Sequence, residues 1–166
     1  MTLSDVERLR ARQLIYDWQM ASPEQVRLYA ARAWNGALFL SSMRDLHPTL
    51  GIGAGWWQRV DYGLFNMNHR GMEILNHVTA VCTGGNYSDL RRTLGYVGNI
   101  RAGHTWEEIL ARHGFQVDPR DAGIQAAYDN LTYGWQAVLF QLRTNRISTI
   151  EDMRRVKTAH LDTLFA

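Results

Sequence analysis

The fold is decided by a stretch in the first third of the chain, SPEQVRLYAARAWNGALFLSSMRDL (residues 22–46). Ser22 is suited to cap a helix that begins at Pro23, because serine accepts hydrogen bonds from first-turn amides and proline is favoured at the first helical position. Apolar residues then recur at helical spacing on several sides: Val26, Ala30, Ala33, Ala37 and Leu40 on one, and Leu28, Trp34, Leu38 and Phe39 on others. A helix that is apolar all round is buried, so we predict that 23–46 is a central helix.

The same signals predict further helices over 4–20, 55–83, 88–101, 105–113, 119–146 and 149–164. Segment 119–146 is also apolar on two sides and becomes the second central helix. Strand-like alternation is nearly absent. The sequence therefore predicts an all-α, single-domain bundle of about six or seven helices that spans residues 1–166.

Glycines inside the predicted helices point to close helix crossings. A glycine in a helix interior costs roughly 1 kcal/mol relative to alanine, and close approach of a neighbouring helix is the natural compensation. The positions concerned are Gly36, Gly63, Gly71, Gly95, Gly98, Gly123 and Gly134.

Composition excludes several classes of protein. The chain has 166 residues, 46% of them hydrophobic, and a net charge of +2, which is incompatible with wholesale disorder. No run of eighteen apolar residues occurs, and the polar start lacks a signal-peptide pattern, so we expect a soluble, intracellular protein without membrane contact. The single cysteine, Cys82, rules out an internal disulfide and a multi-cysteine zinc site. No cofactor is predicted.

The predicted first helix, 4–20, carries apolar residues on opposite sides. Val6, Leu9, Tyr16 and Met20 form one stripe, whereas Leu3, Leu14 and Trp18 point the other way. A terminal helix with two apolar sides indicates a second contact, with another copy of the chain or with a partner. The alternative is that the helix wedges between two helices of its own domain.

Arginine supplies 17 of the 18 basic residues. Its planar guanidinium binds phosphates with two parallel hydrogen bonds, so nucleic acid is a candidate partner. The candidate phosphate contacts are Arg8, Arg12, Arg91, Arg92, Arg154 and Arg155. Surface ion pairing is the alternative interpretation for each of them.

One set of residues has metal-ligand character. His69, Glu73 and His77 are four residues apart within the predicted helix 55–83, so they would share one face of it. A solvated polar face is the alternative. Lys157 falls on the apolar stripe of the last helix, where a desolvated amine could act as a base, although its stem more often lies along apolar surface.

The leading hypothesis is a non-enzymatic, self-associating structural or adaptor protein, such as a coat-like or nucleoprotein-like subunit that contacts nucleic acid through arginines. It rests on the two-sided first helix and the lack of a coherent catalytic set. The second hypothesis is a small all-α enzyme or metal-binding protein centred on His69, Glu73 and His77.

Overall fold

The computed structural model describes residues 22–61, 67, 73–98, 100–118, 120 and 125–164. All regular structure in these ranges is helical, without a strand, which confirms the predicted all-α class. The buried side chains of the described residues form one contiguous core. One domain over 1–166 stays a prediction, because residues 1–21 lie outside the described ranges.

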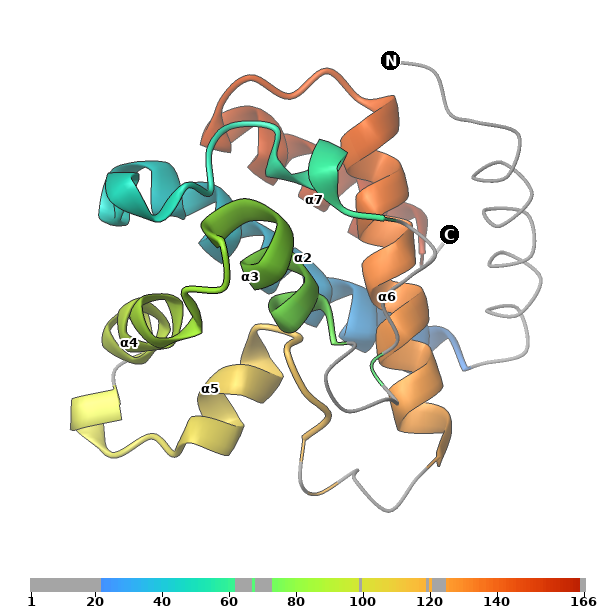
Figure 1. Ribbon diagram of the computed structural model, residues 1–166. Coiled ribbons are helices and arrows are strands. Elements are labelled where there is room, and N and C mark those ends of the chain that lie inside the picture. The colour runs from blue at the N-terminus through green and yellow to red at the C-terminus, as the bar shows by residue number, and fades with distance from the viewer. Residues whose placement is uncertain are drawn as a thin grey trace.

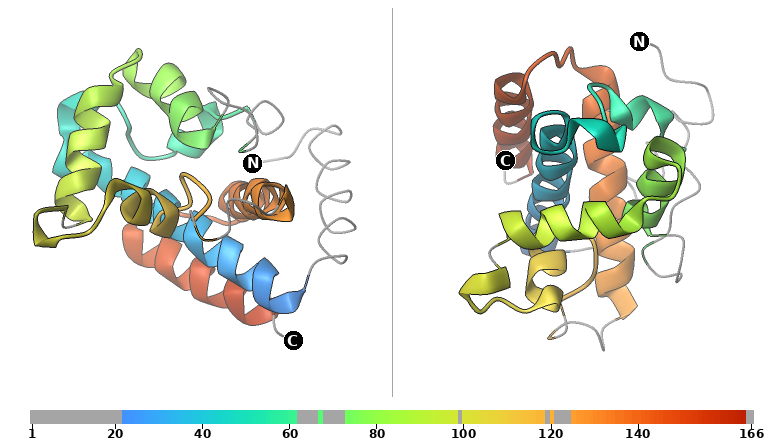
Figure 2. Two further views of the ribbon diagram at one scale, coloured as in Figure 1. Left: turned by 90° about the horizontal axis from the view of Figure 1, so that it is seen from below. Right: turned by 60° about the vertical axis from the view of Figure 1, so that its left-hand side comes forward.

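Helix α2, Pro23–Leu46, lies at the centre of the bundle, as predicted. The Ser22 hydroxyl accepts a hydrogen bond from the Gln25 amide at 3.2 Å, and the helix ends where the His47 amide donates to the Met43 carbonyl at 2.9 Å. Three helices pack on it: α5 (Trp106–Arg112), α6 (Gln125–Thr144) and α7 (Ile150–Thr163). Figures 1 and 2 show α7 running alongside α2, and α6 crossing α2 steeply.

Glycine makes the helix crossings close, as predicted for the described positions. A Cβ atom on Gly134 of α6 would lie 2.8 Å from the backbone oxygen of Tyr29 in α2. One on Gly36 of α2 would lie 2.6 Å from the Trp135 ring of α6. Gly95 and Gly98 are similarly crowded by residues of α5. Gly63, Gly71 and Gly123 lie outside the described residues.

The predicted long helix over 55–83 is wrong. After Gly55, which has a left-handed φ of 73°, a single 3-10 turn, η2, covers Trp56–Arg59, and Val60 is extended. Glu73 is extended as well, and the α-helix here is α3, Ile74–Thr83.

The physical reason lies in where the backbone groups of this segment find partners. Arg143 of α6 donates to the carbonyl oxygens of Trp57 and Val60. The Asp61 amide donates to His77 Nε2 at 2.9 Å, and the Met67 amide donates to Thr132 Oγ1 at 3.1 Å. Side chains from distant segments therefore satisfy groups that a helix would satisfy internally.

The remaining elements follow the predicted order with shifted ends. Helix α4 is Tyr87–Val97, and the expected last turn of 88–101 is a separate 3-10 turn, η3, Ile100–Ala102. Another 3-10 turn, η1, covers Pro48–Leu50. Helix α7 is capped by Thr149, which forms a capping box with Asp152. Among the described helices, none is long and apolar enough to cross a membrane.

Candidate functional site

An apolar groove lies on the molecule, where residues of α2, α4, η3 and α5 come together. We call it the Trp106 groove, and its volume is about 800 Å³. It is lined by Leu46, Arg92, Thr93, Gly95, Tyr96, Val97, Ile100 and Trp106. The described part of the chain exposes five large hydrophobic side chains, and three of these line the groove: Leu46, Tyr96 and Val97. Tyr96 is 79% exposed, which is extreme for an aromatic residue on a helix.

Trp106 is fixed at the base of this groove by contacts on two sides. The edge of its ring lies against Gly95, where a Cβ atom would come within 2.7 Å of it. The guanidinium of Arg91 lies over the ring, 4.5 Å from its centroid, in a cation–π contact. Thr105 caps the helix that carries Trp106 by accepting a hydrogen bond from the Glu108 amide at 3.2 Å. The groove is therefore built on rigid elements.

The structure brings two of the candidate phosphate-binding arginines to the groove. Arg92 lines it and pairs with Asp89 at 3.5 Å, and Arg91 covers Trp106. On α7, Arg154 pairs with Glu151, and Arg155 pairs with Asp152. Surface ion pairing, the alternative interpretation, thus describes three of these four residues. Arg8 and Arg12 lie outside the described residues.

The metal site stays a prediction, but its single-helix geometry is contradicted for Glu73 and His77. Because α3 begins at Ile74, Glu73 precedes the helix that carries His77. Glu73 Oε2 accepts a hydrogen bond from Asn76 at 2.7 Å, and His77 is occupied by the Asp61 amide. His69 lies outside the described residues. Within the described ranges, no three His, Cys, Asp or Glu side chains are grouped as a metal site would need.

The interface residues predicted on the first helix, Leu3, Leu14 and Trp18, also lie outside the described ranges. Their role in self-association stays a prediction.

Two groups on α7, one buried and one half-buried, have lowered pKa values. His160 of α7 accepts a hydrogen bond at Nδ1 from the Trp34 indole at 3.0 Å, and burial lowers the pKa of His160 to about 4. The imidazole is therefore neutral in the core. Lys157 donates to Asn35 Oδ1 at 3.2 Å, and its pKa is lowered by burial and by the nearby Arg154. This lysine spans the contact between α7 and α2.

Sequence reasoning missed the Trp106 groove itself. Its lining comes from four elements, so no local sequence pattern describes it. Of the residues at the groove, only the arginines were singled out from the sequence. The fully exposed Tyr96, one turn after Arg92 on a short helix, is the local feature that could have indicated it.

Comparisons with known proteins add no relative: no family model matches the chain, and neither the curated proteins nor the solved structures gave a match.

Proposed function

We propose that the protein is a self-associating helical subunit with a structural or adaptor role, and that the Trp106 groove receives a second copy. The observation that carries this proposal is the gathering of Leu46, Tyr96 and Val97, all exposed, around the rigidly held Trp106. Exposing large apolar side chains together is unfavourable in water, and such patches mark interaction sites.

The composition of the groove favours a protein partner. Tryptophan, tyrosine and arginine are the residues that contribute most to binding energy at protein interfaces, and they do so when held in well-packed positions. Here Trp106 and Arg91 are already packed against each other, so little side-chain freedom is lost on binding. Tyr96 stands exposed beside them as the anchor.

The occupant that we propose is the second apolar side of residues 1–21 of another copy. Helix α2 has 24 residues and therefore separates Ser22 from Leu46 by about 36 Å. Trp18 lies four residues before Ser22, so even a fully extended chain keeps it within about 14 Å of that residue. Trp18 therefore cannot reach the Leu46 end of the groove of its own chain, whereas Trp18 of a second copy meets no such limit. The resulting contact is head to tail, which builds rings or filaments.

Light scattering and sedimentation of the full chain test this proposal. Tyr96→Asp in the groove and Trp18→Asp in the first segment should each abolish assembly. An equimolar mixture of the two variants should form a dimer and nothing larger, because each variant keeps one intact half of the contact. Leu28→Asp, which changes an exposed apolar residue outside the groove, is the matched control and should assemble normally.

A wild-type mass of 19.1 kDa at all concentrations would refute self-association. A mixture that stays monomeric while each variant fails alone would refute the head-to-tail arrangement.

Exposed aromatic rings beside arginines also stack bases of single-stranded nucleic acid. A labelled oligonucleotide should therefore be titrated against the same variants at low and physiological salt. Steeply salt-dependent binding that Tyr96→Asp abolishes, with no effect on mass, would assign the groove to nucleic acid instead.

A further inference from the structure

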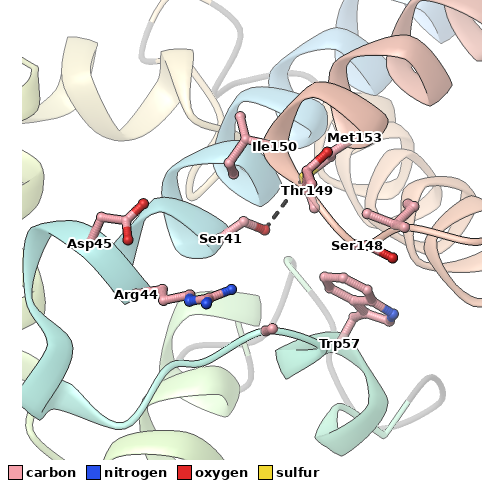
Figure 3. A pocket seen from close by; sticks show the side chains of 10 residues that line it. Ser41, Arg44, Asp45, Trp57, Ser148, Thr149, Ile150 and Met153 are labelled. Atoms are coloured by element: carbon pink, nitrogen blue, oxygen red, sulfur yellow. Dashed lines mark hydrogen bonds between the residues drawn. The ribbon is translucent and has the colours of Figure 1, made fainter.

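A second hollow lies on the molecule, between the last turns of α2, the approach to η2 and the start of α7 (Figure 3). Its volume is about 310 Å³, at the lower end of the range for small-molecule sites. The residues that define its chemistry are Ser41, Arg44, Trp57, Ser148, Ile150 and Met153. We call it the Arg44 pocket.

One buried hydrogen-bond donor among the residues that line the pocket, the indole N–H of Trp57, is unpaired within the described part of the chain. Its side chain is 5% exposed, and its indole N–H has no hydrogen-bond partner among the described residues. Native proteins rarely leave a buried donor unpaired, because the donor loses its hydrogen bonds to water and gains none in return. A bound acceptor would supply the missing partner.

Further donors in the pocket are also uncommitted. The guanidinium of Arg44 extends from α2 toward Trp57 and forms no ion pair with a described residue (Figure 3). In the same view the indole nitrogen of Trp57 lies toward the Ser148 end of the pocket. The N-terminus of α7 also lies here, but its amides are already bonded: those of Ser148 and Thr149 donate to the Asp152 carboxylate, and that of Asp152 donates to Thr149. Arg44 and the Trp57 N–H are therefore the groups that favour an anion.

Two of the three negative groups nearby are paired. In the first turn of α7, Glu151 pairs with Arg154, and Asp152 pairs with Arg155 and closes the capping box. The third, Asp45, also lines the pocket and lies on the far side of Arg44 from Trp57 (Figure 3). Among the described residues that line the pocket, Arg44 alone offers a positive charge.

The rest of the wall is apolar or already satisfied. Ile150 and Met153 of α7 and the Trp57 ring supply apolar surface. Ser41 accepts a hydrogen bond from Trp56 at 2.9 Å and donates to Met153 sulfur at 3.4 Å, so its hydroxyl is occupied.

We infer that the Arg44 pocket binds a small carboxylic acid with an apolar body, with its carboxylate on Arg44 and its body between Trp57 and Ile150. An acceptor atom at the far end of the body would satisfy the Trp57 N–H. The inference is independent of the Trp106 groove and of self-association.

The test uses benzoate and its uncharged analogue benzamide as probes, with the full-length ¹⁵N-labelled protein. The indole N–H resonance of Trp57, assigned with Trp57→Phe, should shift saturably with benzoate. Benzamide should bind at least about tenfold more weakly, because a hydrogen bond to a charged group is worth more than 1.4 kcal/mol. Arg44→Met should weaken benzoate binding by a similar factor, and the matched control Arg92→Met should leave it unchanged.

4-Hydroxybenzoate, which places an acceptor at the far end of the ring, should bind more tightly than benzoate. The inference is overturned if benzoate causes no saturable shift, if benzamide binds equally well, or if Arg44→Met leaves the affinity unchanged. A shift of the Trp106 resonance alone would also overturn it, since the probe would then occupy the other groove. Because Arg44 is exposed, Arg44→Met should fold normally, and the amide spectrum of the variant checks that it does.

Discussion

The buried His160 should make the stability of this protein depend on pH. Its side chain is 8% exposed, and its Nδ1 accepts the hydrogen bond from Trp34. Burial lowers the pKa of His160 to about 4, below the ordinary value of 6.5. The folded state therefore favours the neutral imidazole, and protonation both charges the core and removes the acceptor of the Trp34 indole.

The sign and size of the effect follow from the two pKa values. Because the folded pKa lies below the unfolded one, the stabilisation is fully present above pH 6.5 and is lost as the pH falls toward 4. The largest loss from this group is about 3 kcal/mol, and about 2.5 kcal/mol of it should appear between pH 7.5 and 4.5. Burial also lowers the pKa of His113 and of His77, so these residues act in the same direction.

Urea unfolding at pH 7.5, 6.0 and 4.5, followed by tryptophan fluorescence, measures this dependence. His160→Gln keeps a side-chain oxygen as acceptor for Trp34 and cannot titrate. It should lower the free energy of unfolding at pH 7.5. Between pH 7.5 and 4.5, however, that free energy should fall by about 2.5 kcal/mol less than in the wild type. His104→Gln, at a position outside the core, is the control and should keep the wild-type slope. If His160→Gln loses stability with acid as steeply as the wild type, the assignment to this histidine is wrong.

Three further changes test the packing and capping, each by urea unfolding at neutral pH. Gly134→Ala should cost about 1–3 kcal/mol because the new Cβ meets the α2 backbone, whereas Gly53→Ala, with open space around it, should change little. Thr149→Ala removes the cap of α7 and should cost about 1 kcal/mol, with Thr158→Ala as the exposed comparison. Arg143→Met leaves two carbonyl oxygens near η2 without their donor and should cost at least about 2 kcal/mol, which Arg143→Lys should restore only in part.

Helix starts are the part of this fold that the sequence predicts best, because a cap is a local interaction. Ser22 and Thr105 each accept a hydrogen bond from the amide three residues later, as their spacing indicates. The central position of α2 was also predictable, since apolar residues on several sides leave a helix no solvent-facing side.

The segment 55–83 shows where helical spacing of apolar residues fails to predict the secondary structure. Several of its apolar residues are buried, among them Val60, Met67 and Val78. Burial alone does not distinguish one long helix from short segments that enter the same core, however. The deciding contacts come from Arg143 and Thr132, more than sixty residues away, and no local pattern contains them.

The same limit applies to the functional surfaces. Trp34 and His160 are 126 residues apart, and the linings of the Trp106 groove and the Arg44 pocket each combine several elements. Arg91 and Arg92 were singled out from the sequence for phosphate binding. Both residues lie beside the Trp106 groove, and this placement depends on the packing of α5 against α4.

The last turn of α2 belongs to both surfaces. Arg44 lines the pocket, and Leu46, two residues later, lines the groove from roughly the opposite side of the helix. A ligand that holds Arg44 in place therefore acts on the turn that also positions Leu46. If benzoate changes the association constant of the chain, thermodynamic reciprocity requires that association change benzoate affinity by the same factor. A change in the association constant with benzoate would show that the two surfaces are coupled, and benzoate binding with an unchanged association constant would show that they act independently.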